Sequence, residues 1–284
     1  MATFRAALVQ TTSSRLPERN AEAVEALVRE AAAQGAQYVQ TPENTNIIEH
    51  EADRFFAAIS EEARDPVLKR LRALAAELGI WLHVGSLAVK VAETKAANRA
   101  FVIAPDGSVA ARYDKIHLFD VDLANGEQYR ESAKIRAGGE AVTVDLPWGR
   151  LGVAICYDLR FPHLFRALAQ EGGAGILSVP AAFTKPTGEA HWHVLLRARA
   201  IENGCWLLAA AQGGVHETGR QTYGHSVIID PWGRVVAEAG TDPCVLVADI
   251  DMAEVAAVRG RVPALQHDRD FTLRAADKPL KASA

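Results

Sequence analysis

The chain has 284 residues, of which 49% are hydrophobic and 23% charged, and these proportions exclude a disordered chain and predict a soluble globular protein. Its net charge is −4 and its lysines and arginines are scattered among acids, which argues against nucleic acid as a partner. The sequence has no run of about 18 uncharged apolar residues and its first residues lack a signal-peptide pattern, so we expect neither a membrane protein nor an exported one.

The first predicted strand is the apolar run FRAALVQ, and a helix follows it with Asn20 as its possible N-cap and Gly35 as its end. The segment AQYVQTPEN then predicts a short strand that ends at Pro42. Glu43 therefore lies at the carboxyl end of a strand, where open α/β sheets gather their ligands. This position makes Glu43 a candidate functional residue.

The segment DPVLKRLRALAAELGI carries a complete helix signature, with Asp65 as the N-cap and Gly79 as the end. The strand WLHVGSLAV comes next, and RAFVIAPDGSVAARYDKIHL predicts a hairpin whose second arm delivers Lys115. Residues 119–140 show no sustained period and are rich in glycine and acids, so we interpret them as one long loop. Loops of this length in compact domains are usually functional.

In the second half, RLGVAIC and GAGILSVPAAF predict buried strands around a helix that begins near Pro162. The segment EAHWHVLLRARAIENG predicts a helix that ends at Gly204, and the strand CWLLAAAQ, the hairpin GHSVIIDPWGRVVAEAG and the strand CVLVADID follow. From Arg261 onward the sequence is polar and irregular, which predicts a surface arm. These elements predict an α/β fold with mixed sheets beneath helices, and the lack of a linker favours one domain.

Cys156 lies where the predicted strand RLGVAIC ends. The three cysteines of the chain are too few and too far apart for a disulfide framework, which favours a reducing cytoplasm. Cys205 and Cys244 are interpreted as core thiols, because free cysteines are among the most buried residue types. A nucleophilic Cys156 needs a nearby base or cation to form its thiolate. Glu43 and Lys115 are candidates, although each by itself is also typical of a solvated surface charge.

Three motifs resemble the nitrilase superfamily of carbon-nitrogen hydrolases: TPEN around Glu43, RYDKIHLFDVD around Lys115 and GVAICYDLRFPHLFRALA around Cys156. The likeness continues through HWHVLLRARAIENGCWLLAAAQ and YGHSVIIDPWG, so it covers nearly the whole chain. It implies an α/β fold that is a four-layer αββα sandwich with two mixed sheets. It also implies a single carbon-nitrogen hydrolase domain over residues 1–284 with a C-terminal arm over 261–284, a homodimer, and no metal or organic cofactor.

The same resemblance implies a catalytic set. Glu43 resembles the general base, Lys115 the lysine that stabilises the oxyanion, and Cys156 the nucleophile. The second glutamate of the family corresponds to Glu131 or, as the alternative, to Glu127. The cysteine would attack the carbonyl carbon of a small-molecule amide, the amine would leave with a proton from the general base, and water would hydrolyse the remaining thioester.

Within the superfamily, PAAFTKPTGEAHWHVLLRARAIENG and GHSVIIDPWG resemble the Nit branch, whose activities include deaminated glutathione amidase and ω-amidase. An N-carbamoyl amino acid amidohydrolase is a further alternative. Because the first two substrates are acidic, we expect a cation to bind a carboxylate, and Arg160 is the candidate unless it pairs with Asp158. The Tyr157 backbone N–H would complete the oxyanion hole, and Phe183 either walls the pocket or belongs to the core. His193 stands where many relatives have glutamate.

Three rival interpretations come from the residues alone. His191 and His193 form an HxH pair of the kind found in zinc-dependent amidohydrolases, but they lie at the start of a predicted helix, where positions i and i+2 diverge. A papain-like pair would need a histidine base for Cys156, and nothing in the sequence marks one; His117 is interpreted as a strand residue with a nearby hydrogen bond. The intact catalytic set argues against a binding or scaffold protein that has lost its chemistry.

Overall fold

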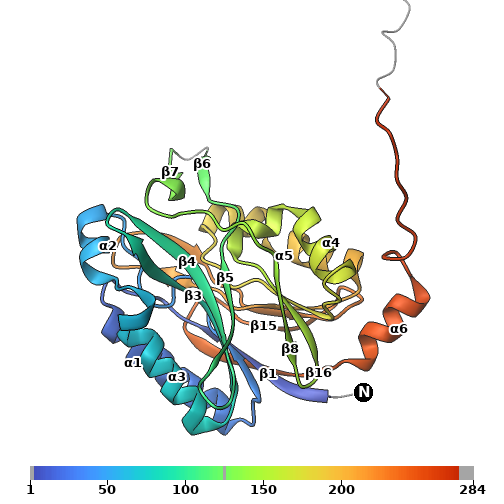
Figure 1. Ribbon diagram of the computed structural model, residues 1–284, viewed down its shortest axis with the longest axis horizontal. Coiled ribbons are helices and arrows are strands. Elements are labelled where there is room, and N and C mark those ends of the chain that lie inside the picture. The colour runs from blue at the N-terminus through green and yellow to red at the C-terminus, as the bar shows by residue number, and fades with distance from the viewer. Residues whose placement is uncertain (1–2, 124–125, 275–284) are drawn as a thin grey trace, which may run out of the picture.

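The computed structural model of the chain describes residues 3–123 and 126–274. Two six-stranded sheets pack face to face, and helices cover their outer faces, so that four layers result (Figure 1). Two helices lie on each outer face, α1 (Pro17–Ala33) and α3 (Pro66–Leu78) on the first sheet and α4 (Pro162–Gln170) and α5 (Lys185–Asn203) on the second. The predicted αββα architecture with two mixed sheets is confirmed.

Both sheets combine parallel and antiparallel neighbours. The first sheet has the order β16-β1-β2-β3-β4-β5, with β1 (Thr3–Gln10), β2 (Tyr38–Gln40), β3 (Trp81–Ala92), β4 (Lys95–Ile103), β5 (Val109–Asp114) and β16 (Cys244–Asp251). The second has the order β15-β14-β11-β10-β9-β8, with β8 (Val142–Leu146), β9 (Gly149–Val153), β10 (Ile176–Ser178), β11 (Trp206–Ala209), β14 (Val227–Ile229) and β15 (Val235–Glu238). Strands β1, β2 and β3 are parallel to one another, as are β9, β10 and β11.

Smaller elements surround the two sheets. Two hairpins lie outside them, β6 (Asp120–Asp122) with β7 (Gln128–Arg130) and β12 (Gly213–Val215) with β13 (Gln221–Tyr223). The remaining helical segments are α2 (Ala52–Ala58), α6 (Ala253–Arg261) and the 3₁₀ turns η1 (Glu62–Arg64), η2 (Glu131–Ala133) and η3 (Cys156–Arg160).

The apolar run FRAALVQ shows how burial on both faces determines a strand sequence. Ala6 and Leu8 of β1 belong to the core between the two sheets, whereas Ala7 and Val9 pack against the helices on the outer face. Successive side chains of a strand point to opposite faces, so a strand that is covered on both sides is apolar at almost every position.

The predicted ends of two helices are confirmed. At the start of α3, the Asp65 carboxylate accepts the N–H of Leu68 at 2.8 Å, which satisfies one of the free donors of the first turn. Gly79 and Gly204 follow α3 and α5 with left-handed φ angles of 64° and 56°, a conformation that glycine adopts without a steric penalty.

The predicted N-cap of the first helix is wrong. Helix α1 begins at Pro17, and Asn20 lies inside its first turn with a buried side chain. Its Oδ1 accepts the N–H of Ser14 at 2.7 Å and its Nδ2 donates to the carbonyl of Asn46 at 2.8 Å. Asn20 therefore joins the start of the helix to the loop after β2, a contact that local sequence patterns do not report.

Two segments are more regular than predicted. Residues 119–140 contain the hairpin β6–β7 and the turn η2 instead of one continuous loop. Helix α6 ends at Arg261, the residue at which the predicted arm begins. From 262 to 274 the chain has neither helix nor strand and extends away from the body (Figure 1). Residues 275–284 of the predicted arm lie outside the described residues.

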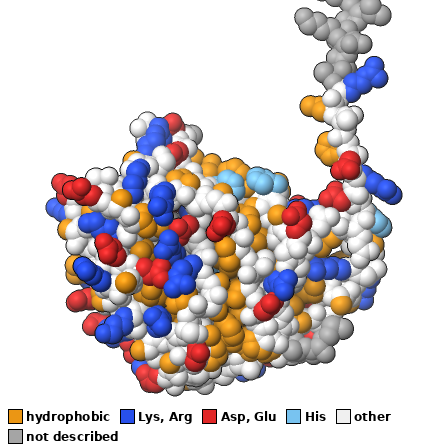
Figure 2. All heavy atoms as spheres, in the orientation of Figure 1, with side chains coloured by type: hydrophobic (Ala, Val, Ile, Leu, Met, Phe, Trp, Pro, Cys, Tyr) orange, Lys and Arg blue, Asp and Glu red, His pale blue; other side chains and the backbone are white. Residues whose placement is uncertain are grey.

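The surface carries charges of both signs. Figure 2 shows lysine and arginine side chains interspersed with aspartate and glutamate over the visible face, with apolar side chains between them. Of the helices in the described part of the chain, none has both the length and the apolar character that crossing a bilayer requires.

Candidate active site

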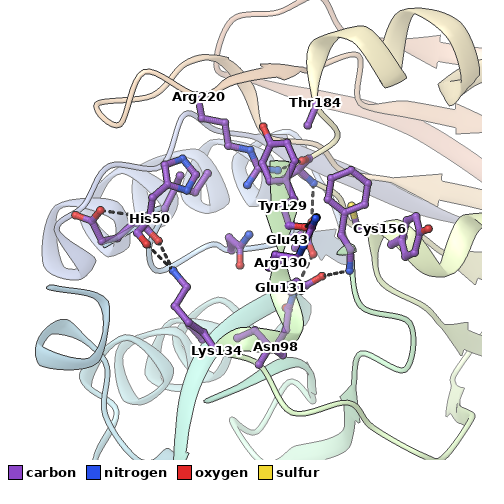
Figure 3. Close-up of a pocket in the computed structure, with 18 of the residues that line it drawn as sticks. Glu43, His50, Asn98, Tyr129, Arg130, Glu131, Lys134, Cys156, Thr184 and Arg220 are labelled. Carbon is purple, nitrogen blue, oxygen red and sulfur yellow. Dashed lines mark hydrogen bonds between the residues drawn. The ribbon is translucent and has the colours of Figure 1, made fainter. Parts of the chain in front are cut away.

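A cavity of about 540 Å³ opens where strands of both sheets end (Figure 3). Glu43 enters it from the loop after β2, Lys115 directly follows β5, and Cys156 begins the turn η3 after β9. The segment 119–140 and the residues after β10 supply other parts of the lining. The fold thus brings the three predicted catalytic residues, which are far apart along the chain, to one cavity.

Glu43 is buried and its carboxylate accepts three hydrogen bonds. Its side chain is 3% exposed. Its Oε1 accepts from Lys115 Nζ at 2.8 Å and from Asn98 Nδ2 at 2.9 Å, and its Oε2 accepts the backbone N–H of Ala182 at 2.9 Å. Three donors stabilise the charged form and fix the orientation of the carboxylate.

A glycine allows the loop that carries Glu43 to pass close to the sheet. A Cβ atom at Gly85 in β3 would lie 2.1 Å from the carbonyl oxygen of Thr41 and 2.5 Å from the Cβ of Pro180. Asn44 takes a left-handed φ of 56°, and its N–H donates to Ser86 Oγ at 2.9 Å. The backbone is therefore held against β3 both before and after Glu43 in the sequence.

Lys115 lies between two carboxylates. Its Nζ donates to Glu43 Oε1 at 2.8 Å and to Glu131 Oε2 at 2.8 Å and Oε1 at 3.1 Å, and its side chain is 2% exposed. Glu131 also accepts the N–H of Phe119 at 2.7 Å. Glu127 lines the same cavity, but its carboxylate accepts the phenol of Tyr129 at 3.0 Å. Of the two glutamates that the sequence left open, the fold joins Glu131 to the lysine.

Cys156 has a left-handed φ of 49°, a conformation that is uncommon outside glycine and that clusters at functional sites. The buried Asp158 carboxylate holds this turn, because it accepts the N–H of Ile155 at 2.8 Å and the phenol of Tyr113 at 2.6 Å. It also contacts His117 Nδ1 at 2.7 Å. Asp158 therefore anchors the turn of the second sheet to β5 of the first, next to Lys115.

The charges of the site depend on one another. Burial by itself would raise the pKa of Glu43, but the Lys115 ammonium holds it below its ordinary value. Burial would lower the pKa of Lys115, yet Glu131 and Glu43 raise it well above its ordinary value. Burial raises the pKa of the Cys156 thiol, and the Glu43 carboxylate raises it further against the opposite effect of Lys115. At neutral pH the resting site therefore contains a carboxylate, an ammonium and a protonated thiol.

Asn98 is a member of the site that the sequence did not indicate. Its Nδ2 donates both to Glu43 Oε1 at 2.9 Å and to Glu131 Oε1 at 3.1 Å, so a single amide bridges the two carboxylates. Asn98 lies on β4, whose sequence KAANRAFVI also contains Lys95 and Arg99, so polarity alone does not single it out. A buried polar side chain in the middle of a strand needs partners from elsewhere in the fold.

The predicted substrate-binding residues differ in their placement. Tyr157 and Phe183 line the cavity. Arg160 is not part of this lining: its guanidinium lies over the rings of Tyr157 and Phe183, 5.8 and 5.6 Å from their centroids, and contacts His191 Nδ1 at 3.3 Å. The alternative pair with Asp158 is not formed either within the described residues, because that carboxylate binds other donors. Arg160 therefore packs behind the aromatic wall.

Other cations line the cavity, and sequence reasoning missed them. Arg220, in the connection between β12 and β13, lies over the ring of Tyr129 with 5.4 Å to the centroid. Its buried Nε has no hydrogen-bond partner within the described residues. Lys134 also lines the cavity, but its Nζ already donates to the carbonyls of Glu49 and His50. Arg220 thus brings a guanidinium to the cavity wall, where its Nη2 donates to the carbonyl of Ala182 at 2.5 Å. It lies on a short hairpin that the sequence analysis did not predict.

The rival histidine arrangements are not assembled around Cys156. His191 and His193 lie on α5 as predicted and their side chains diverge, the first toward Arg160 and the second toward Glu238. Among the described residues, His50 is the histidine that lines the cavity, and burial followed by Arg220 and Lys134 lowers its pKa. The group that interacts with the thiol is the carboxylate of Glu43 and not an imidazole.

The fold and the site together define a carbon-nitrogen hydrolase. Residues 5–260 match the carbon-nitrogen hydrolase family, and the chain belongs to this family. It is an enzyme that hydrolyses amides, as the activities of its relatives also indicate.

Relatives of known activity match nearly the whole chain. Deaminated glutathione amidase of Synechocystis sp. is 42% identical over 271 residues, which cover 94% of this chain and 98% of that protein. Omega-amidase NIT2 of Mus musculus is 37% identical over 269 residues, which cover 95% of this chain and 96% of that protein. The crystal structure of the C. elegans NitFhit protein has a TM-score of 0.88 and 37% identity, with 95% of this chain and 66% of that chain covered. The predicted resemblance to the Nit branch of the nitrilase superfamily is confirmed.

Proposed function

We propose that Cys156 is the nucleophile of a thioester mechanism, with Glu43 as general base and acid and Lys115 as the oxyanion donor. The observation that carries this proposal is the buried ammonium of Lys115, which contacts Glu43 and Glu131 at 2.8 Å beside the thiol. A positioned base and a preorganised cation are what attack on an amide carbonyl requires.

The proposed reaction has two halves. Glu43 takes the thiol proton as Cys156 Sγ bonds to the carbonyl carbon, and the negative oxygen is stabilised by Lys115 Nζ and the Tyr157 N–H. The carbon-nitrogen bond then breaks as Glu43 returns the proton to the amine, which leaves a thioester. Water attacks the thioester carbonyl, Glu43 accepts its proton, and the proton returns to the sulfur when the acid departs. Glu131 keeps Lys115 charged and in position throughout, since it holds the ammonium from the other side.

This mechanism is tested by trapping the intermediate. Enzyme mixed with an excess of substrate and quenched in acid should carry the acyl group on the peptide that contains Cys156, measured by mass spectrometry. Hydroxylamine should intercept the thioester and yield a hydroxamate. If turnover proceeds while no acyl adduct forms on Cys156 and no hydroxamate accumulates, the thioester route is excluded.

We further propose that the substrate is deaminated glutathione. The relative of this name is 42% identical over nearly the whole chain. The lining of the cavity also includes the guanidinium of Arg220, a cation that can pair with a substrate carboxylate. Figure 3 shows Arg220 and Lys134 on the other side of Glu43 from Cys156, so an acidic group at some distance from the reacting amide would meet positive charge.

The second candidate activity is that of an ω-amidase, because a relative of this name is 37% identical. A panel of deaminated glutathione, 2-oxoglutaramate and an N-carbamoyl amino acid separates the candidates when release of the acid and amine is measured, with Cys156→Ala as the inactive control. We expect the highest kcat/KM for deaminated glutathione. A higher value for 2-oxoglutaramate or the carbamoyl compound refutes this substrate and leaves the mechanism intact.

We also propose that the protein is a cytoplasmic homodimer. A reducing compartment keeps the proposed nucleophile a free thiol. Val194 and Ile201 on α5 and Trp232 in the β14–β15 turn are 69%, 52% and 47% exposed, and an apolar face of this kind is typical of a contact with a second copy. Light scattering should give twice the mass of the chain, and Val194→Glu should shift it toward the monomer. A monomeric parent protein excludes the dimer.

A further inference from the structure

Three side chains outside the catalytic cavity converge on one point of the surface. His193 lies on α5, His225 shortly precedes β14, and Glu238 ends β15. Glu238 Oε1 is 2.8 Å from His193 Nε2 and 2.8 Å from His225 Nδ1. One ligand atom from each residue can be chosen such that all three lie within 4.8 Å of one another. The catalytic mechanism uses none of these residues.

His225 is held in place by its own surroundings. Its ring stacks on Tyr223 with centroids 4.3 Å apart, and its carbonyl accepts the indole N–H of Trp192 at 2.8 Å. Its backbone N–H donates to the carbonyl of Gly240 at 2.8 Å. An imidazole whose position is already fixed loses little conformational entropy when it binds a ligand.

The electrostatics at this point favour a cation. The carboxylate of Glu238 lies between the two imidazoles, 2.8 Å from a ring nitrogen of each. One carboxylate oxygen and two imidazole nitrogens thus converge on one point, and this set of donor atoms suits a cation. The side chains are 31%, 27% and 34% exposed for His193, His225 and Glu238, so an ion from solvent can reach them.

We propose that His193, His225 and Glu238 form a binding site for a divalent transition-metal ion, with Zn²⁺ as the ion that fits best. Imidazole nitrogens and a carboxylate oxygen are the ligands that Zn²⁺ takes in proteins. Three protein ligands leave one tetrahedral position for water. The HxH motif contributes only one histidine to this site, because His191 faces Arg160 instead.

Binding requires a small rearrangement. Ligand atoms about 2.0–2.1 Å from a tetrahedral ion are roughly 3.3 Å apart, whereas each ring nitrogen is now 2.8 Å from the carboxylate oxygen. A rotation of the partly exposed Glu238 side chain, together with small movements of the two rings, would bring the ligand atoms to this spacing. The protons now shared with the carboxylate would move to the opposite ring nitrogens, His193 Nδ1 and His225 Nε2, so that the coordinating nitrogens present lone pairs.

A bound ion would link α5 to the strands β14 and β15, which the chain brings together only when folded. Metal binding therefore adds to the free energy of unfolding, and the effect grows with the concentration of free ion. This consequence gives the proposal a readout that does not depend on amide hydrolysis.

The test uses the full-length protein with Cys156→Ala, so that the catalytic thiol cannot bind the ion. After removal of metals with a chelator, Zn²⁺ is titrated by calorimetry and Co²⁺ by its visible absorption, and thermal unfolding is measured with and without Zn²⁺. We expect one ion per chain, a tetrahedral Co²⁺ spectrum and a higher Tm. Glu238→Gln and His193→Ala should each weaken the affinity at least about tenfold. His191→Ala, on the same helix, is the matched control and should bind as the parent does.

Two results would overturn the metal site. One is the absence of Zn²⁺ binding by the parent protein, and the other is equal affinity in the parent and in both ligand variants. Circular dichroism of the metal-free variants establishes that each is folded, and His193→Ala serves as the second variant because its position is on the partly exposed side of a helix. Either negative result leaves the proposed amidase function untouched.

Discussion

Glu43→Gln should separate two effects of this carboxylate that oppose each other. The negative charge of Glu43 adds to the effect of burial and raises the pKa of the Cys156 thiol. As the proposed base, the same carboxylate accepts the thiol proton. The amide of glutamine has nearly the same shape but neither property. The substitution should therefore increase the thiolate fraction of Cys156 and at the same time abolish amide hydrolysis.

The structure sets the expected size of the change. Lys115 keeps its contacts with Glu131 at 2.8 and 3.1 Å, so the ammonium stays charged and continues to stabilise the thiolate. A nearby negative charge raises the pKa of a thiol, so removal of the Glu43 charge should lower the pKa of Cys156 and speed its labelling at neutral pH. Loss of a general base typically lowers kcat about 100- to 10,000-fold.

The assay is the rate of iodoacetamide labelling of Cys156 as a function of pH, followed by peptide mass spectrometry. Cys205 is followed separately in the same digest, and its labelling should be slow because burial raises its pKa to about 11. Glu131→Gln is the matched control, because Glu131 also contacts Lys115, whereas Glu43 is the carboxylate that raises the pKa of Cys156. An unchanged or higher pKa of Cys156 in Glu43→Gln would refute the electrostatic coupling.

Four further outcomes are expected. Asn98→Ala removes a hydrogen-bond donor that two carboxylates share. Hydrogen bonds to charged groups contribute about 1.5–3 kcal/mol, so both kcat and the free energy of unfolding in urea should fall. An unchanged kcat would contradict a positioning role for Asn98. Because folding lowers the pKa of Glu43, the contribution of its charge to stability is complete above the ordinary pKa of 4.5 and is lost as pH falls through the lower pKa of the folded state. The difference in the free energy of unfolding between the parent and Glu43→Gln should therefore shrink only below pH 4.5. A difference that stays constant from neutral pH downward would contradict this prediction. Arg220→Ala should raise KM for an acidic amide more than for a neutral one, measured under identical conditions, and equal increases would remove Arg220 from substrate recognition. If residues 1–284 form one domain with an arm, brief proteolysis should cut within 262–274. The remaining protein should then unfold in a single calorimetric transition, whereas two transitions would indicate two domains.

Predictions from sequence were most accurate where neighbouring residues decide the structure. Asp65 and Gly79 delimit α3 because a cap needs only a side-chain acceptor or a left-handed glycine within the same few residues. Asn20 has the right residue type for a cap, but its partners Ser14 and Asn46 come from outside the helix. Its true role could be seen only when the loop after β2 was in place.

The candidate site divides in the same way. The sequence by itself determined the residue types at the strand ends and, through the motifs around Glu43, Lys115 and Cys156, the family and its chemistry. The tertiary structure alone decided that Asn98 bridges two carboxylates and that Arg220, not Arg160, lines the cavity. The physical reason is that a motif is a local pattern, whereas a cavity is lined by side chains from several strands whose proximity depends on how the two sheets pack.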